Sequence, residues 1–232
     1  MKKLSLIAAI DANGLIGVDN KIPWSVPEDM SHFAAYTKGK GVIMGSSTFY
    51  SIGKPLENRT SIVISSNTKK FDVYMSKLFD LYESTGKDLP LVINAESLND
   101  IFQANLDFLG DELVCIGGGK MYESLLPYAT NLIITKLKIE ATVPPNGKNL
   151  VYFPSFDENE WEVTGSQNLV SSLGITTGEI IFLERKEKYS NVFSFRTKKN
   201  ISIEEIYCSL NGLEANSYSF LETEYVEDGD SA

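Results

Sequence analysis

The sequence predicts an α/β fold: a single domain with a central, mixed and mostly parallel β-sheet, flanked by helices in three layers. Three observations predict it. Continuous apolar runs of strand length recur along the chain, as is typical of strands buried on both faces. Stretches with helical spacing separate these runs, and two late segments have the pattern of a closing antiparallel pair. No internal repeat is visible.

Composition and charge limit the classes of function. Of the 232 residues, 43% are hydrophobic and 22% are charged, which is typical of a globular chain in water. The net charge of −10 argues against nucleic-acid or membrane partners, because both need a basic face. Cys115 and Cys208 lie far apart, which fits a reducing compartment. His32 is the single histidine, so neither a zinc site nor a Ser-His-Asp triad is expected, and no metal site is predicted.

The first apolar run, from Leu4 to Ile10, has the length of a central strand. Together with Met1–Lys3 it superficially resembles a signal peptide, but its apolar part is short and lacks a cleavage-site pattern. It continues directly into the turn Asp11–Gly14. We therefore expect a buried first strand in a cytoplasmic protein.

The stretch from Ile16 to Phe33 begins as a loop and ends in a helix, which is expected over about residues 27–37. Ser25 and Glu28 have the spacing of a capping box, and Pro27 is tolerated in a first helical turn. Lysines and glycines over 38–41 end this helix.

Asp29 lies in the first turn of this helix, with Phe33 one turn further on the same face. Beside Met30 and Phe33, and below the Pro23–Trp24 pair, its carboxylate could be a reactive acid in an apolar pocket. The alternative is structural, because the helix dipole favours acids in first turns. This stretch alone leaves both interpretations open. The neighbouring His32 is expected to be an exposed or satisfied side chain.

The next elements are a buried strand over 41–45, a short helix over 46–52 and a third strand over 60–66. The junction after Gly45 could hold a phosphate on backbone N–H groups, although many such turns share the pattern. Residues 67–88 predict surface loops with a helix around 76–82.

The strongest phosphate-binding pattern is the strand, glycine run and helix over residues 112–126, with the glycines at 117–119. It is neither a spaced Gly-x-Gly-x-x-Gly nor a P-loop, and a tight turn without a ligand is the alternative. The other elements expected are a strand over 91–93, a helix over 98–109, a strand over 132–137, a Pro/Gly loop over 143–149, and the closing pair over 161–164 and 178–185.

The character of the chain changes after Lys186, which predicts a first domain over 1–186 and an extension over 187–232. The acidic end of the extension, residues 222–232, is expected to be disordered. The extension is too short for a core of its own, so it packs on the main domain, binds a protein partner or stays loose. It carries no visible chemistry.

In this order the motifs resemble the dihydrofolate reductase family, over nearly all of residues 4–186. The matching motifs are Ser5–Ala9, Ile16–Gly17, Pro23–Trp24 with Pro27 and Asp29, Val42–Gly45, Ser51–Leu56 with Arg59, Ile116–Gly119 with Tyr122, Thr135, and Phe182–Arg185. Each motif is weak alone, but all of them fall in register. The resemblance implies reduction of 7,8-dihydrofolate to 5,6,7,8-tetrahydrofolate with NADPH, which supplies one-carbon carriers for thymidylate and purine synthesis.

The resemblance also implies a substrate pocket. The substrate-binding residues it implies are Ile7, Asp29, Phe33, Ile52, Arg59 and Thr135. Asp29 would bind the amino and ring N–H groups of the pterin, with Trp24 and Thr135 fixing water around it as the other catalytic residues. Whether Asp29 delivers the proton to the imine nitrogen or only orients the ring is left open. Arg59 would bind the α-carboxylate of the glutamate tail.

For NADPH the resemblance implies a glycine turn close to the dinucleotide, a second phosphate site after residue 45 and a ribose edge after residue 64. The loop Ala12–Ile22 would close over the nicotinamide and exclude water. The cofactor-binding residues implied are Ala9, Leu15, Ile16, Gly17, Ile22, Gly45, Ser46, Ser47, Thr48, Ile64, Ser65, Ser66, Ile116, Gly117, Gly118, Gly119, Lys120, Met121 and Tyr122.

One departure concerns the phosphate side of this site. Ser46 and Ser47 stand where many relatives carry a basic residue, which leaves the strength of the preference for NADPH over NADH open. Lys69, Lys70 or Lys120 are candidates to compensate.

Two other functions are compatible with this fold. A protein of this fold that serves as a structural or interaction component would not need an intact site, yet no site position has decayed here. A nicotinamide-dependent reductase acting on an aminopyrimidine would not need the Asp29 pocket together with Arg59. The sequence has both features, which favours dihydrofolate as the substrate.

Overall fold

The computed structural model describes residues 3–103, 106–143 and 147–187. These belong to the first of two compact units into which the chain divides, residues 1–200. The expected domain boundary at residue 186 lies one residue beyond the last strand, β10 (Thr176–Arg185). The extension after residue 187 lies outside the described residues, so its expected disorder and its partner stay predictions.

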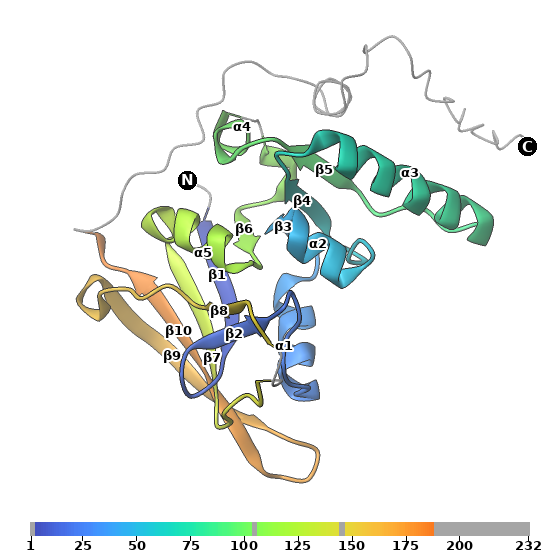
Figure 1. Ribbon diagram of the computed structural model, residues 1–232. Helices are drawn as coiled ribbons and strands as arrows, with labels where there is room; N and C mark the ends of the chain where they lie inside the picture. The colour runs from blue at the N-terminus through green and yellow to red at the C-terminus, as the bar shows by residue number, and fades with distance from the viewer. Residues whose placement is uncertain (1–2, 104–105, 144–146, 188–232) are drawn as a thin grey trace, which may run out of the picture. The chain divides into compact units, whose positions relative to one another are not determined.

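An eight-stranded sheet in the order β5-β4-β3-β6-β1-β7-β10-β9 forms the centre (Figure 1). Its other strands are β1 (Lys3–Ile10), β3 (Gly41–Gly45), β4 (Thr60–Ile64), β5 (Val92–Ala95), β6 (Glu112–Cys115), β7 (Asn131–Leu137) and β9 (Trp161–Val170). Every pair from β5 to β7 is parallel, whereas β10 runs antiparallel to both β7 and β9. The mixed, mostly parallel sheet and its closing antiparallel pair are confirmed.

Strand register decides which side chains share a face of the sheet. Ile7 pairs with Ile133, and Val42 pairs with Val114, so these side chains point to one face. They pack beneath α1 (Pro27–Thr37), α2 (Ser46–Ile52) and α3 (Thr68–Thr85). α5 (Gly119–Leu125) covers the other face, and the three layers are confirmed.

The start of α1 corrects one expectation. The helix begins at Pro27 as predicted, but its N-cap is Val26, and no side chain caps it. The Ser25–Glu28 capping box is therefore wrong. Glu28 instead accepts a hydrogen bond from the hydroxyl of Thr177 on β10, and this contact is distant in sequence.

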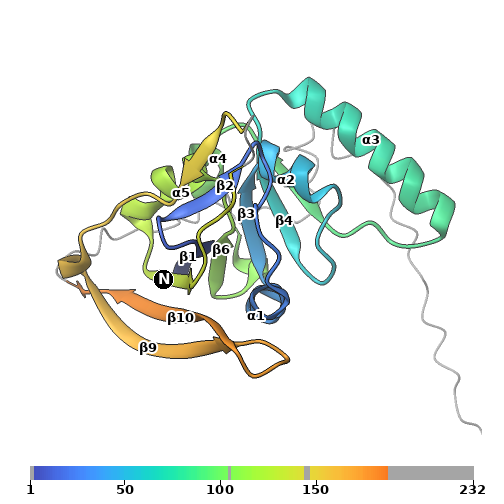
Figure 2. The same cartoon turned by 60° about the horizontal axis from the view of Figure 1, so that its bottom comes forward.

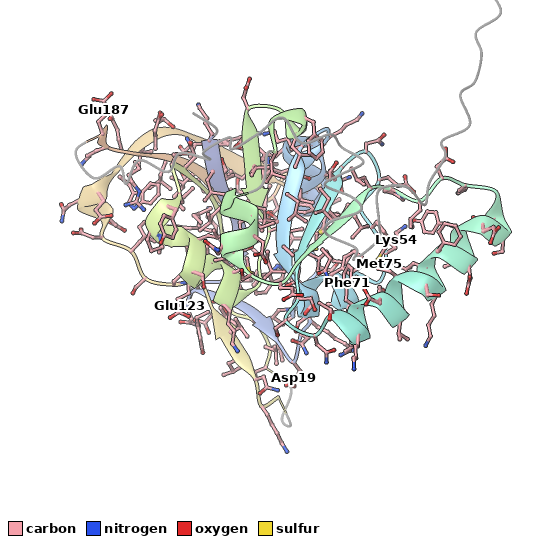
Figure 3. All side chains as sticks on the ribbon, turned by 90° about the horizontal axis from the view of Figure 1, so that it is seen from above. Asp19, Lys54, Phe71, Met75, Glu123 and Glu187 are labelled. Carbon is pink, nitrogen blue, oxygen red and sulfur yellow. The ribbon has the colours of Figure 1, made fainter. Side chains whose placement is uncertain are left out.

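The long helix α3 corrects a second expectation. Residues 67–88 form one 18-residue helix, Thr68–Thr85, rather than loops around a short helix. The Asn67 side chain caps it by accepting from the backbone N–H of Lys70, and Gly86 ends it in the left-handed conformation. Figure 3 labels Phe71 and Met75 on the side of α3 that faces the strands, where Phe71 is buried.

Two short strands were not predicted. β2 (Leu15–Val18) lies inside the expected lid loop and pairs antiparallel with β8 (Leu150–Tyr152), which directly follows the expected loop over 143–149. The helical pattern over 98–109 becomes α4 (Leu98–Gln103) and the 3₁₀ turn η1 (Asp107–Leu109), and two further 3₁₀ turns are η2 (Leu126–Tyr128) and η3 (Glu158–Glu160). Figure 2 shows the β9–β10 hairpin at one edge of the sheet, with α3 at the other side. None of the helices that the structure describes combines the length and apolar character of a membrane span.

Candidate active site

Several of the predicted site residues lie where parallel strands end on the same side of the sheet, whereas Arg59 precedes β4 and lies at the opposite end of that strand. On the shared side, the neighbours β4, β3, β6 and β1 lead into Ser65, Gly45, Ile116 and Asp11. The chain adds β4 and β5 on one side of β3 and then returns to place β6 between β3 and β1, so the order in which strands are added reverses here. Ligand crevices of open α/β sheets lie outside such a reversal.

Asp29 lies half-buried in the first turn of α1. Burial raises the pKa of its carboxyl above the ordinary value, while a hydrogen bond from Thr135 and the charge of His32 act against the rise. Thr135 is 1% exposed and sits on β7 opposite Ala9. It therefore lies on the strand next to β1, close enough to the carboxyl of Asp29 to influence its pKa. Met30, which was expected beside this carboxylate, is 53% exposed and turns away.

Apolar side chains from two clusters meet beside Asp29. The α1 cluster contains Ile7, with Trp24 and Phe33 packed against it. The α2–α3 cluster, built around Phe49 and Phe71, has Ile52 packed against it. Ile116, at the end of β6, packs against both clusters. The residues predicted to line the pterin pocket thus come from both clusters, and Ile116 lies where the two clusters meet.

Arg59 lies on the loop between α2 and β4, where two hydrogen bonds hold its guanidinium. Nε donates to the carbonyl oxygen of Glu57 at 2.9 Å, and Nη1 donates to Thr37 Oγ1 at 3.2 Å. Burial lowers its pKa from the ordinary value, and the charge of Glu57 opposes this. A surface pocket lined by residues 39, 57–60 and 88–91 includes this side chain.

The two strand-to-helix junctions predicted to hold phosphates touch each other. The N–H of Gly45 donates to the carbonyl oxygen of Gly117 at 2.9 Å. A Cβ atom at Gly118 would lie 3.3 Å from Thr48 Oγ1, and one at Gly45 would lie 3.4 Å from Met121 Cγ. The Gly117–Gly118 peptide is cis. The backbone at this contact carries no side chain, which suits a dinucleotide that approaches it closely. Ser46 to Thr48 and Lys120 to Tyr122 follow the two junctions in the chain.

Tyr122 joins the glycine turn to the first strand. Its hydroxyl donates to the carbonyl oxygen of Ile7 at 2.7 Å, and a Cβ at Gly117 would lie 3.1 Å from its ring. Burial, with the charges of Cys115 and Asp29, raises the pKa of Tyr122 well above its ordinary value. The phenol stays protonated and keeps donating.

Hydrogen bonds hold the base of the predicted lid, residues 12–22, to the rest of the site. Asp11 accepts hydrogen bonds from the N–H groups of Leu15 and Asn13 through one oxygen and from that of Ala141 through the other. Burial opposes ionisation of Asp11, but these donors together lower its pKa. A Cβ at Gly119 would lie 2.5 Å from Val151 of β8, so the glycine turn passes directly under the β2–β8 pair.

The lid is also tied at its tip. Asp19 accepts from the backbone N–H and side-chain amide of Asn149, both at 3.1 Å, and Ser51 of α2 donates to the carbonyl oxygen of Asn20 at 2.6 Å. Figure 3 labels Asp19 at this end. Ile22, a predicted cofactor-binding residue, is 59% exposed.

The ribose edge divides between its two serines. Ser65 is 3% exposed and donates its hydroxyl to the carbonyl oxygen of Asn67, whereas Ser66 is exposed. Lys70, a candidate to replace the missing basic residue, lies 4.8 Å above the ring of Tyr50. Among the described residues no group of three or more potential metal ligands occurs.

Several residues of the site escaped prediction. Glu28, Asp19 and Val151 contact partners far along the chain, and Asp11 bonds both its own turn and the distant Ala141. No local pattern signals the distant pairs. The turn after Asp11 was the one available signal.

Fold and site together define the class of a dinucleotide-binding α/β reductase. The family model of dihydrofolate reductase matches residues 3–173. The dihydrofolate reductase of Bacillus subtilis is 33% identical over 199 residues, covering 86% of this chain and 96% of that protein. The one from Haemophilus influenzae is 37% identical over 159 residues, covering 68% and 83%. The chain belongs to the dihydrofolate reductase family.

A solved structure agrees with this assignment. Dihydrofolate reductase from Enterococcus faecalis, complexed with NADP(H) and RAB-propyl, aligns with a TM-score of 0.60 at 26% identity. The alignment covers 80% of this chain and 97% of that one.

Proposed function

We propose that Asp29 is the group through which this chain binds the pterin ring and governs its protonation. The chain catalyses the NADPH-dependent reduction of 7,8-dihydrofolate to tetrahydrofolate, the reaction of its family. NADPH supplies the hydride when it is bound. What remains for the protein is to hold the pterin, exclude water and provide a proton where the imine nitrogen needs one.

The observation that carries the role of Asp29 is its half-buried carboxyl in a largely apolar setting, where burial raises its pKa and Thr135 acts against the rise. In the ionised form, its two oxygens can accept the paired N–H groups of a pterin. Its raised pKa keeps more of the carboxyl protonated near neutral pH than in an exposed aspartate, so a proton is close at hand. Thr135 orients the group in both forms.

The other predicted residues take supporting roles in this proposal. Ile7, Trp24, Phe33 and Ile52 border the ring pocket. Arg59 offers the unbonded part of its guanidinium to the α-carboxylate.

On the cofactor side we assign the turn from Gly117 to Tyr122 and the junction from Gly45 to Thr48 to the dinucleotide phosphates. Leu15 to Gly17 in β2 and Ala9 on β1 would border the nicotinamide, and Ile64 with Ser66 the ribose. The contact between the two junctions supports these assignments.

We place the activity in residues 1–186 and the protein in the cytoplasm. The low cysteine content, two residues far apart in the sequence, supports a reducing compartment.

The experiment is Asp29→Asn, with consumption of NADPH followed by absorbance in the presence of dihydrofolate. Asparagine keeps the shape but cannot ionise or carry the proton, so we expect turnover to fall about 10²- to 10⁴-fold. Asp72→Asn, on the exposed side of α3, is the matched control and should leave turnover unchanged. Wild-type turnover in Asp29→Asn would refute the role.

A further inference from the structure

His32 lies three residues after Asp29 on α1, so the two side chains share a helix face. Its ring packs edge-on against Phe182 of β10 and lies tilted to that of Tyr36, with centroids 6.1 Å apart in both pairs. Its Nε2 atom is buried and has no hydrogen-bond partner among the residues that the structure describes. Buried polar atoms are nearly always paired, so this imidazole calls for an explanation.

Two carboxylates near His32 already have partners of their own. Glu28, on the same helix, accepts a hydrogen bond from Thr177 at 2.5 Å. Glu112, on β6, accepts one from the hydroxyl of Tyr36 at 2.6 Å and also forms an ion pair with a lysine. Neither depends on the imidazole.

The strands packed against α1 offer mostly apolar groups at this point. Phe182 of β10 and Leu169 of β9 belong to the α1 cluster or pack against it. Glu184, two residues beyond Phe182 on the same face of β10, is exposed, where solvent screens its charge. Glu28 is also half-buried, and its charge acts on Asp29, whereas Asp29 is the group whose charge acts on His32. Burial lowers the pKa of His32, and the charge of Asp29 opposes that shift.

We propose that His32 is a positioning residue for the reaction, which acts through Asp29 by making the protonation of the two side chains mutually dependent. This inference rests on the proposed role of Asp29. A protonated His32 stabilises an ionised Asp29, and by thermodynamic reciprocity an ionised Asp29 holds the proton on His32 equally strongly. The tie between the two is electrostatic and follows from their places on one helix face.

The coupling affects the site when the pH falls. An isolated carboxyl would become protonated and lose its two-oxygen grip on the pterin N–H groups. With His32 beside it, the first proton taken up goes partly to the imidazole, and the resulting cation keeps Asp29 ionised. His32 thus extends to lower pH the range in which ionised Asp29 binds the pterin. For the same reason Asp29 becomes protonated, and proton transfer becomes faster, only at lower pH.

The single histidine of the chain makes a direct test possible, because its imidazole signals in a proton NMR spectrum of the untagged, full-length protein are unique. The protein is titrated with NADPH bound, without substrate. Asp29→Asn should shift the His32 midpoint to lower pH, since the charge that favours its protonation is gone. Asp72→Asn, which removes an exposed carboxylate from α3, is the control and should leave the midpoint in place. An unmoved midpoint in Asp29→Asn, or an equal shift in both variants, would overturn the proposal.

A second measurement reads the consequence for the reaction. The rate of hydride transfer is followed from mildly acid to alkaline pH in the wild type, His32→Gln and His32→Lys. Wild type and His32→Gln should coincide at alkaline pH, where His32 is neutral, and the wild type should fall below His32→Gln as the pH decreases. His32→Lys, with a permanent charge, should lie below both throughout.

A purely structural role for His32 would instead change the rate by one factor at every pH, and such parallel profiles would overturn the proposal. Failure of the underlying role of Asp29 has a different signature, which is wild-type turnover in Asp29→Asn.

Discussion

Glu112, at the start of β6, is a carboxylate held ionised by three donors. Lys40 Nζ lies 2.6 Å away, the hydroxyl of Tyr36 2.6 Å and that of Ser5 2.5 Å. Burial opposes ionisation, but these donors outweigh it, so the pKa of Glu112 lies below its ordinary value. Because Tyr36 belongs to the last turn of α1, the cluster fastens the end of that helix to the sheet.

We expect Glu112→Gln to lower the free energy of unfolding by about 1–2 kcal/mol at pH 7. A carboxyl whose pKa is depressed by folding adds stability above its unfolded value, about 4.3, and loses it as the pH falls through the folded value. Urea unfolding of both proteins at pH 7 and at about pH 3 should therefore show a difference that shrinks with acid. A difference of constant size would contradict this explanation.

Arg59 offers a prediction about substrate affinity. Arg59→Lys keeps the charge but loses the planar fork, so we expect KM for dihydrofolate to rise about tenfold, equivalent to ~1.4 kcal/mol, with kcat little changed. Lys54→Ala removes an exposed cation from the same loop and is the control, with KM unaltered. If kcat falls instead of KM rising, Arg59 does not bind the substrate tail.

At the scale of elements, the lid is a paired structure rather than a free loop. β2 pairs with β8, and the tie from Asp19 to Asn149 closes the far end. Its contacts are exposed, so each contributes little alone.

Asp19→Ala removes that tie. We expect limited proteolysis within residues 12–22 to speed up and NADPH to bind about two- to threefold more weakly, which corresponds to ~0.5 kcal/mol. Asp72→Ala on α3 serves as the control. Equal protease sensitivity in the two variants would mean that Asp19 does not hold the lid closed.

The elements that sequence reasoning predicted well are the ones with local signals. β3 and α2 have the expected bounds, because an apolar run, a glycine and a hydroxyl-rich start follow one another. α3 was underestimated because exposed Val73 and Phe79 obscure the spacing of its buried Phe71 and Leu78. β2 and β8 are short, and their pairing joins segments that no window of sequence contains together.

The candidate site shows the same contrast between features with a local sequence signal and features without one. The position of Asp29 in a first turn was predictable, and so were the glycines that bring two junctions into contact. The influence of Thr135 on Asp29 depends on how α1 packs against β7, which no local stretch of sequence determines. The coupling of His32 went unseen because a single position says nothing about which ring will pack against it.

At the scale of the whole molecule, the described fold ends with β10. The N–H of Lys186 donates to the carbonyl oxygen of Glu160 at 2.9 Å, and the guanidinium of Arg185 lies 4.2 Å from the ring of Trp161 and pairs with Glu160. No contact that we describe continues beyond residue 187.

A chain that ends at Glu187 should therefore keep kcat and KM within about twofold of the full-length values, because the sheet is complete at that point. A chain that ends at Ile180 removes the half of β10 that pairs with Asn131–Ile134 of β7, and the exposed edge should cause aggregation. Steady-state kinetics and size-exclusion chromatography measure the two outcomes. Loss of activity in the first chain would assign a role to the extension.

The place of β1 between β6 and β7 has a consequence for biosynthesis. Leu4 pairs with Leu113 and Ile7 with Ile133, so the first strand made finds both of its neighbours only after more than half of the chain has left the ribosome. Such non-local pairing slows folding and leaves apolar strands uncovered meanwhile. Asp29 is synthesised early, and Thr135 is synthesised only with β7. The pocket is therefore assembled only once β7 has been made.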